Sequence, residues 1–309
     1  MKTAHFLRIA LLSNAVFSVV CGLLMLVWPG FIGSLLGPQI DLLWRLLGLG
    51  LLIFAADLVH QATRPRLLTW RALYASVGDF LWVIGSAVGL LLFSSQFSLT
   101  GVVMVLVVAG VVWVFGCWQI WGIDRAHRAA NPALYRHCLV VRTKASAAAM
   151  WHVIERMGDI QNYAPSLLRS ELLHDQTPGL GVVRRCTAQS GRCWSEECVA
   201  FEPGHSFTMR FVAEAPDFPF PVSAMVGGWQ VMSVEAGSAV KVWWELAPQP
   251  RFLAPVLLPI LALGADRDVV QVIRRMEDDA LAQKPDRARL ETPQNRMTGG
   301  DMSSRHEPC

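Results

Sequence analysis

Charge is scarce in the first part of this 309-residue chain. No lysine occurs between Lys2 and Lys144, the first glutamate is Glu155, and residues 6–123 carry only eight charged side chains. The whole chain is 53% hydrophobic and 17% charged, with a mean hydropathy of +0.38. These values exclude an intrinsically disordered protein and argue against a wholly soluble one. We therefore expect one part of the chain to lie in a membrane and the rest in water.

Long apolar stretches fill the charge-poor part. A helix needs about 20 residues to cross ~30 Å of hydrocarbon, and four stretches reach that length: 9–28, 42–62, 72–93 and 99–123. Pro29-Gly30, Gly37-Pro38 and Pro65 lie between them, where the backbone can reach water. The sequence predicts a transmembrane bundle of four α-helices in residues 1–124, followed by a linker at 125–136.

Basic residues mark only one side of this bundle. The first and third connections between the stretches contain no Lys or Arg, whereas the basic residues gather before the first stretch, between the second and third, and after the fourth: Lys2, Arg8, Arg64, Arg66, Arg71, Arg125, Arg128 and Arg136. Cytoplasmic loops carry such an excess. The first stretch is too long for a signal-peptide core of ~7–15 residues, so we expect it to be retained. The prediction is a multi-pass inner (plasma) membrane protein with both termini in the cytoplasm.

Signatures of metal, cofactor and nucleic-acid binding are missing. The seven cysteines show no paired spacing, and Cys193 and Cys198 lie five apart in a predicted strand, so their side chains point to opposite faces. We expect free thiols, no metal site and no cofactor. Membrane topology accounts for the arginine clusters, and with a net charge of +3 no nucleic-acid partner is predicted.

Three polar residues interrupt the apolar stretches. Asn14, Asp57 and Asp79 lie at similar depth from the cytoplasmic side when counted at about 1.5 Å per residue. A carboxylate at such a depth costs about 2.5–3.5 kcal/mol or more unless it is paired or protonated. One interpretation is an intramembrane polar cluster that responds to protons or to a ligand. The other, which we favour, is that each aspartate pairs with a nearby arginine or hydrogen-bonds across helices to fix their packing.

The pattern changes at residue 137. A strand at 138–143 precedes a helix at 147–157 with Ser146 as its cap, and six further strand-like runs follow. These runs are 167–174, 181–189, 192–201, 205–213, 225–235 and 238–247. Their alternation predicts a sheet with one apolar and one wet face. A final helix is predicted over 265–281, because Pro255 and Pro259 argue against an earlier regular start. The fold class is a transmembrane four-helix bundle followed by an α+β domain at 137–283, with a disordered tail at 284–309.

The order of these elements resembles the helix-grip fold of the START-like (SRPBCC) superfamily, in its polyketide cyclase/dehydrase and lipid-transport branch. The residues that carry the resemblance run in order through the domain: Trp151, Asp159, Asn162-Tyr163, Gly179, Gly181-Val182-Val183-Arg184, Glu196, Phe201-Glu202-Pro203-Gly204, Gly228-Trp229, Val240 and Trp244. Single motifs are weak, but their order over 137–282 is fairly specific. The bundle resembles small bacterial membrane proteins, a likeness that carries no function.

The resemblance implies a cavity for a hydrophobic ligand between the sheet and the last helix. Its candidate lining residues are Trp194, Phe207, Met209, Phe211, Trp229 and Trp244, although each of them could equally be core. We expect a membrane-anchored binding or transfer protein for a lipid- or polyketide-like ligand. The alternatives are a cyclase- or dehydratase-type enzyme, in which Glu196 or Arg210 would be needed, and a sensor whose ligand changes the bundle. No catalytic residue is assigned, because no nucleophile elbow or comparable motif is present.

Two weakly charged segments flank the predicted cavity. Residues 215–222 hold Phe218 and Phe220 among three prolines, and residues 252–265 are almost uncharged. Either segment could form a lip over the cavity or touch the membrane surface. The plainer interpretation is that both pack over the open end of the sheet.

Overall fold

The computed structural model describes residues 2–173 and 177–282. The predicted disordered tail, 284–309, lies outside these residues. The chain divides into two compact units. One comprises Met1–Arg128 with Phe252–Leu263, and the other comprises Ala129–Arg251 with the chain from Gly264 onward. Each unit is described by itself.

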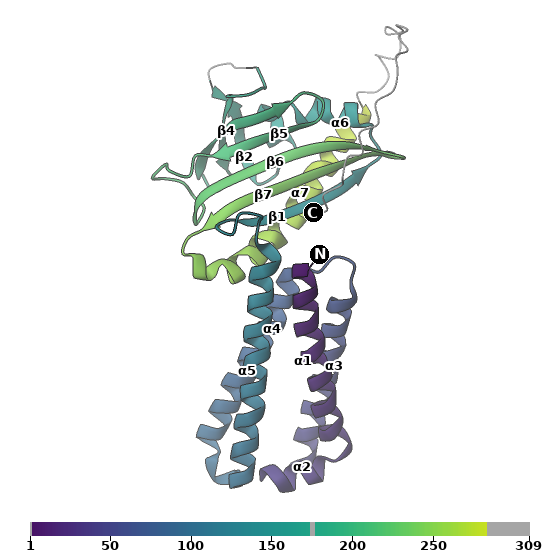
Figure 1. The fold of residues 1–309 in the computed structure, drawn as a ribbon, viewed down its shortest axis with the longest axis vertical. Coiled ribbons are helices and arrows are strands. Elements are labelled where there is room, and N and C mark those ends of the chain that lie inside the picture. The colour runs from purple at the N-terminus through teal and green to yellow at the C-terminus, as the bar shows by residue number, and fades with distance from the viewer. Residues whose placement is uncertain (1, 174–176, 283–309) are drawn as a thin grey trace. The chain divides into compact units, whose positions relative to one another are not determined.

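The first unit is a helical bundle (Figure 1). Within the described residues, four helices are long and apolar enough to cross a membrane, one for each of the four apolar stretches in the sequence. They are α1 (Lys2–Val27), α3 (Asp41–Thr63), α4 (Thr69–Leu92) and α5 (Leu99–His127). A short helix, α2 (Pro29–Leu36), stands where the sequence suggested a turn, because Pro29 occupies the first helical position, where the missing N–H costs nothing.

Two glycines set the close approach of α1 and α3. A Cβ added at Gly22 would lie 2.9 Å from the carbonyl oxygen of Gly48, and one added at Gly48 would lie 2.7 Å from that of Gly22. Small residues allow helix backbones to meet in this way inside membranes. α4 packs along α5, whereas α3 and α4 approach each other only slightly. The bundle is therefore loosely closed between α3 and α4.

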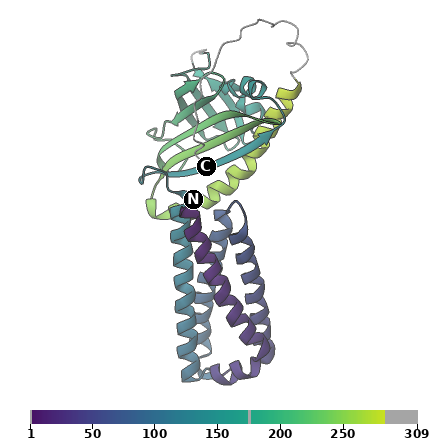
Figure 2. The ribbon, with the colours of Figure 1, turned by 45° about the vertical axis from the view of Figure 1, so that its right-hand side comes forward.

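The second unit is a seven-stranded antiparallel sheet with helices (Figures 1 and 2). The strand order is β1-β7-β6-β5-β4-β3-β2, so β1 and β2 are the edges. All seven predicted strands are present: β1 (Tyr135–Thr143), β2 (Leu167–Leu172), β3 (Val183–Ala188), β4 (Cys193–Glu202), β5 (Ser206–Phe211), β6 (Val222–Val234) and β7 (Gly237–Pro248). β2 carries a register shift between Leu167 and Arg169. The fold class predicted from the sequence, four apolar helices and then a helix-grip sheet, is confirmed.

Helices α6 (Ala147–Ile154) and α7 (Ala254–Ala282) accompany this sheet, with the 3₁₀ segment η2 (Met157–Asn162) after α6. The side chain of Ser146 accepts a hydrogen bond from the backbone N–H of Ala149 and so caps α6, as predicted. Val272, Ile273 and Met276 of α7 join α6 and one face of the sheet in a single apolar core. We call the face that meets this core the inner face.

The start of α7 differs from the prediction. The helix begins at Ala254, eleven residues before the predicted start, and continues through Pro259. Pro255 falls in the first turn, where backbone N–H groups have no acceptor within the helix, so it costs little. Ala254, Leu258 and Ala262 are buried along one side, and this burial offsets the one hydrogen bond that Pro259 removes.

The thiol prediction needs one correction. Five cysteines are free, namely Cys21, Cys117, Cys186, Cys193 and Cys198. Cys138 of β1 is instead disulfide-bonded, so the expectation that it is a free thiol was wrong. Odd cysteine counts and irregular spacing cannot identify such a bond in advance.

Candidate functional site

Alternate residues of β4 and β5 form the inner face of the sheet. Cys198 lies opposite Met209, and Glu196 lies opposite Phe211. Because side chains alternate along a strand, Glu197 and Arg210 point to the outer face. Along these strands the inner face therefore carries apolar side chains near α6 and the carboxylate of Glu196 towards its other end.

The apolar part of the inner face is closed core. Phe207 and Met209 are buried, with 3% and 2% exposure, and Phe207 lies 6.3 Å from Trp151 of α6 between ring centroids. Trp229 packs against the same core but is only partly buried. Of the predicted lining residues, Phe207 and Met209 are thus packed on all sides and Trp229 lies at the core's edge.

Trp244 lies further along the inner face. Its ring stacks on His137 at 6.1 Å between centroids, and it covers Gly227, where an added Cβ would lie 2.9 Å from the indole. Trp244 keeps part of its surface accessible. The glycine thus makes room for a large ring to lie flat against the sheet, where it packs at the edge of the core as Trp229 does.

A buried ion pair occupies the neighbouring strands. Arg184 of β3 lies directly opposite Glu196 of β4, and the two side chains are joined by an ion pair while only 6% and 5% exposed. Arg184 also donates to the carbonyl of Met157, at 2.9 Å. Burial alone would lower the pKa of Arg184, but the adjacent Glu196 carboxylate raises it overall. The pair is therefore charged and fixed in place.

Aromatic side chains surround this pair. The indole N–H of Trp194 donates to the Glu196 carboxylate at 2.6 Å, and the Trp194 ring lies 5.3 Å from that of Phe220. Phe220 also contacts Phe211 at 6.4 Å and Phe218 at 5.4 Å. We call these four residues, Trp194, Phe211, Phe218 and Phe220, the aromatic cluster. All four are half-buried.

Phe218 and Phe220 belong to the segment that joins β5 to β6. This segment, residues 212–221, contains the lip expected from the sequence, and its rings lie on inner-face side chains of β4 and β5. These aromatic side chains lie on the face that elsewhere forms the core, yet they are only half-buried, so each keeps part of its surface accessible.

A buried thiol completes the polar end of the inner face. Cys186 of β3 is 1% exposed, and its sulfur lies 3.8 Å from Ser170 Oγ and 3.9 Å from Glu196 Oε1. Burial, followed by the charge of Glu196, raises the pKa of Cys186 to about 12. The thiol is consequently neutral and a poor nucleophile at ordinary pH.

Arg210 does not share a site with Glu196. It pairs on the outer face with Glu197 at 2.9 Å and with Glu214 at 3.1 Å. Strand alternation therefore separates the two residues named for the enzyme alternative, with Glu196 on the inner face and Arg210 on the outer face. Among the described residues, no group of three or more His, Cys, Asp or Glu side chains is placed to hold a metal ion.

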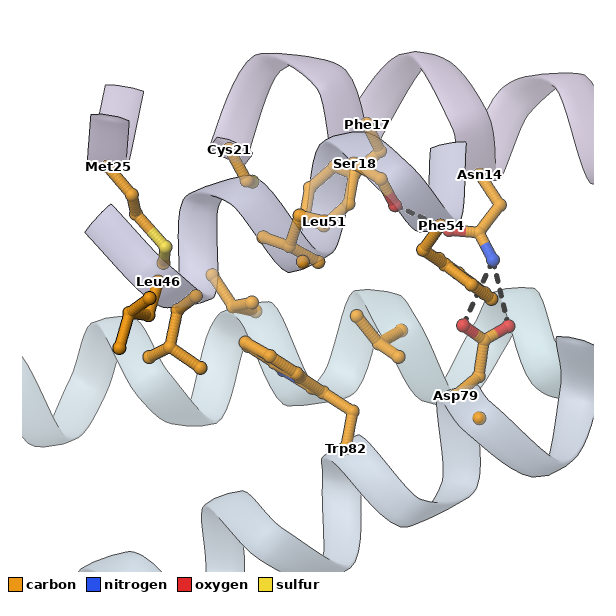
Figure 3. A pocket seen from close by; sticks show the side chains of 15 residues that line it. Asn14, Phe17, Ser18, Cys21, Met25, Leu46, Leu51, Phe54, Asp79 and Trp82 are labelled. Carbon is orange, nitrogen blue, oxygen red and sulfur yellow. Dashed lines mark hydrogen bonds between the residues drawn. The ribbon is translucent and has the colours of Figure 1, made fainter. Parts of the chain in front are cut away.

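The bundle holds a second buried polar group (Figure 3). Asn14 of α1 donates to both carboxylate oxygens of Asp79 of α4, at 3.0 and 2.8 Å, and Gln119 of α5 donates to one of them at 2.9 Å. Ser18 donates to the amide oxygen of Asn14 at 3.2 Å, and Ser76 donates to that of Gln119 at 3.3 Å. These five side chains are at most 4% exposed. We call them the bundle polar cluster.

The structure brings together two of the three polar residues that the sequence singled out. Asp57 lies apart from Asn14 and Asp79, because it forms an ion pair with Arg71 and accepts a hydrogen bond from Gln61. Sequence reasoning missed Gln119, Ser18 and Ser76. Their signal was present as polar residues within apolar stretches, with Ser18 one helical turn after Asn14.

The comparisons with known proteins concern the second unit. Residues 139–280 match the family model described as polyketide cyclase/dehydrase and lipid transport. The chain is similar in structure to norcoclaurine synthase from Thalictrum flavum, with 17% identity over 49% of this chain and 96% of that one and a TM-score of 0.39. It is also similar to the Zhui aromatase/cyclase from Streptomyces sp. R1128 (17% identity, 48% and 95% covered, TM-score 0.39).

A further similar structure is the major latex-like protein 151 of Panax ginseng, with 16% identity over 48% of this chain and 99% of that one and a TM-score of 0.38. No curated protein gives a match to the chain. The family match covers β2 to β7 completely, the greater part of β1 and nearly all of α7. The C-terminal half of this chain is therefore a START-like domain of the polyketide cyclase/dehydrase and lipid-transport family.

Proposed function

We propose that this chain is a membrane-anchored protein that binds or transfers a hydrophobic, lipid- or polyketide-like molecule. The ligand binds on the inner face of the sheet, between the aromatic cluster and α7, and the four apolar helices hold the domain at the membrane. The single observation that carries the proposal is the half-buried aromatic cluster at one end of the inner face of a domain from this family.

The polar groups of this site favour binding over catalysis. Glu196 is the acidic residue on the inner face beside the aromatic cluster, and both Arg184 and Trp194 already engage its carboxylate. A carboxylate held by a guanidinium is a weak general base, because proton uptake would break the ion pair. Cys186 is neutral. The proposal therefore assigns the pair the role of a fixed polar end that orients the ligand.

The arginine distribution supports a cytoplasmic position for the domain. The basic residues lie at the ends of the apolar helices that the positive-inside rule assigns to the cytoplasm. α5 ends at His127 and β1 begins at Tyr135, so the connection between them is short. A short tether keeps the binding domain at high effective concentration near the inner leaflet. Transfer of an apolar molecule into or out of that leaflet follows from this arrangement.

A fluorescent acyl probe tests the binding site. We expect the full-length protein in neutral nanodiscs to raise the emission of dansyl-undecanoic acid, excited directly, in a saturable way. Trp194→Leu should weaken the apparent affinity about tenfold, equivalent to about 1.4 kcal/mol. Phe220→Ser should act in the same direction because it removes the ring that contacts Trp194.

Trp243→Leu is the matched control. Trp243 lies beside Trp244 on β7 but faces outward, over Gly228 and Arg136. The substitution removes one tryptophan from the same sheet and leaves the inner face unaltered. The apparent affinity for dansyl-undecanoic acid should therefore not change. Equal loss in Trp194→Leu and Trp243→Leu, or no saturable signal in the unaltered protein, would refute the proposed site. Native mass spectrometry of the protein purified from its own cells would then identify the natural ligand.

A reporter fusion tests the membrane orientation separately. Alkaline phosphatase joined after Arg136 should be inactive and green fluorescent protein joined there should be fluorescent, because both report a cytoplasmic position. Active phosphatase at that point would reverse the proposed topology while leaving the ligand proposal to be judged by the binding assay.

A further inference from the structure

The bundle contains a cavity of about 270 Å³ whose wall includes three members of the bundle polar cluster, Asn14, Ser18 and Asp79 (Figure 3). The remaining lining is almost entirely apolar, and its large rings are Phe17 of α1, Phe54 of α3 and Trp82 of α4. All four long helices contribute residues. A buried carboxylate is costly inside a membrane, and here it lies at the edge of a cavity as well as in hydrogen bonds across the helices.

A second, larger cavity of about 720 Å³ adjoins the first. The two share six lining residues, Cys21, Met25, Leu47, Gly78, Trp82 and Val108. The second is lined mainly by apolar side chains and by the glycines of α4. Its volume lies within the ~300–1,000 Å³ typical of small-molecule sites. Together the cavities form a polar end that leads into an apolar chamber.

The hydrogen bonds that the Asp79 carboxylate already accepts determine which head group of a ligand fits the polar end of the first cavity. All three donors to its carboxylate, two N–H···O contacts from Asn14 and one from Gln119, come from uncharged amides. A carboxylate offers about four lone-pair positions, so about one remains open. When Asp79 is ionised, its charge repels an anionic head group. A hydroxyl brings a single donor and needs a single acceptor, which matches the position that remains.

We propose that the bundle binds a long-chain molecule with one hydroxyl head, such as a fatty or isoprenoid alcohol, with the hydroxyl donating to Asp79 and the chain in the larger cavity. This site is separate from the one on the sheet and does not depend on it. The slight contact between α3 and α4 leaves a side of the bundle through which such a chain enters from the bilayer. The bundle is then a binding module in its own right.

Matched brominated probes test the proposal, because bromine quenches tryptophan fluorescence on contact and Trp82 lines both cavities. The full-length protein in phosphatidylcholine nanodiscs is titrated with dibrominated stearyl alcohol and with dibrominated stearic acid at about pH 9, where the acid is ionised. We expect saturable quenching by the alcohol and at least about tenfold weaker binding of the acid. Because Trp44 also lines the larger cavity, the saturable component should shrink in Trp82→Phe and disappear when Trp44→Phe is added.

Two glycine variants separate occupancy from nonspecific partition. An added Cβ meets nothing within 4 Å at Gly50, which lines the first cavity, or at Gly110, which lines neither. Leucine at both positions favours the helix over glycine, so both variants should fold. Gly50→Leu should abolish saturable quenching, and Gly110→Leu should leave it unchanged.

Asp79→Asn tests the head-group preference, because it removes the charge and places an amide at the same point. The difference between the alcohol and the acid should shrink several-fold. Equal quenching by both probes in the unaltered protein, or unchanged quenching in Gly50→Leu, would overturn the proposal. Loss of binding of dansyl-undecanoic acid in Trp194→Leu bears only on the sheet, so the two proposals fail independently.

Discussion

Two buried carboxylates, one in each unit, are stabilised in different ways. Glu196 in the sheet faces a guanidinium and an indole N–H, so its charge is matched by a full opposite charge. Asp79 in the bundle is held by amides from two other helices. The first arrangement fixes a charged pair in one geometry. The second supplies hydrogen bonds without neutralising the charge, so the group keeps its capacity to attract a donor from outside the protein.

The same contrast appears in the surroundings of each acid. The Arg184–Glu196 pair sits on strands whose register is set by backbone hydrogen bonds, and its neighbours Cys186 and Ser170 are buried polar groups. Asp79 lies at the wall of a cavity, on a helix that touches α3 only slightly. The charge-matched pair is therefore held rigidly by the strands around it, whereas the carboxylate without a counter-charge adjoins a cavity in which a ligand can bind.

Breaking the ion pair should give the largest effect. Arg184→Met leaves Glu196 buried without its counter-charge and should lower the free energy of unfolding of the sheet domain by about 3–5 kcal/mol. Hydrogen-exchange mass spectrometry of the full-length protein during a urea titration would report this loss in β3 and β4.

The double variant Arg184→Met with Glu196→Leu provides the control. It removes both charges and keeps apolar volume, so most of the lost stability should return. If the double variant is as unstable as Arg184→Met, lost packing rather than the stranded charge explains the effect.

The second-largest effect is expected at the thiol of Cys186 beside Glu196, which the fold should protect from alkylation. With its pKa raised from 9.0 to about 12, Cys186 should react with iodoacetamide at pH 8 about a thousandfold more slowly than in the denatured chain, since only the thiolate reacts. Because the folded pKa is raised, the associated stability is present below pH 9 and is lost as the pH rises from about 9 towards 12. Mass spectrometry of the alkylated peptide would give the rate.

Glu196→Gln sharpens this test. It removes a negative charge that raises the pKa of Cys186 while Arg184, which lowers it, remains. Alkylation of Cys186 should therefore accelerate. An unchanged or slower rate would show that burial alone sets the pKa.

Removing the bundle carboxylate should cost less. Asp79→Leu strands no opposite charge and leaves only the amides of Asn14 and Gln119 to find other partners, so the bundle should lose about 1–2 kcal/mol. Unfolding in sodium dodecyl sulfate, followed by circular dichroism, would measure it. A loss equal to that of Arg184→Met would show that the two acids contribute to stability alike and would contradict the comparison.

The outer face of the sheet should give the smallest effect. Arg210 is 42% exposed and pairs with Glu197 and Glu214. Arg210→Ala should change stability by less than about 1 kcal/mol, because water and salt screen exposed ion pairs. It should also leave binding of dansyl-undecanoic acid unchanged, since Arg210 faces away from the aromatic cluster. Weakened probe binding would instead place the ligand site on both faces of β5.

Much of this fold could be predicted from the sequence because two strong periodicities carry it. Apolar stretches long enough for a membrane gave the four long helices, and alternation between turn residues gave the seven strands. The start of α7 was missed because the proline rule was applied to Pro255 and Pro259 without the burial of Leu258 and Ala262, which only the structure provides.

The candidate sites were less predictable. Depth along a helix placed Asn14 and Asp79 at one level, but it could not show that Asp57 faces Arg71 instead, because helix rotation depends on packing. The alternation of side chains along a strand was enough to predict that Glu196 and Arg210 lie on opposite faces of the sheet. Phe220 lies in a loop, where no periodicity applies. Its contact with Trp194 of β4 therefore had no signal in the sequence.

The edge strand β2 affects whether copies of this protein can pair through their sheets when they are close together. β2 is only six residues long, its pairing shifts at Leu167, and Arg169 and Glu171 form an ion pair at 2.6 Å on it. Short, irregular and charged edge strands resist joining the edges of other sheets. Copies confined to the plane of a bilayer would meet far more often than copies in solution, and this edge protects them from aggregating through β-strand pairing.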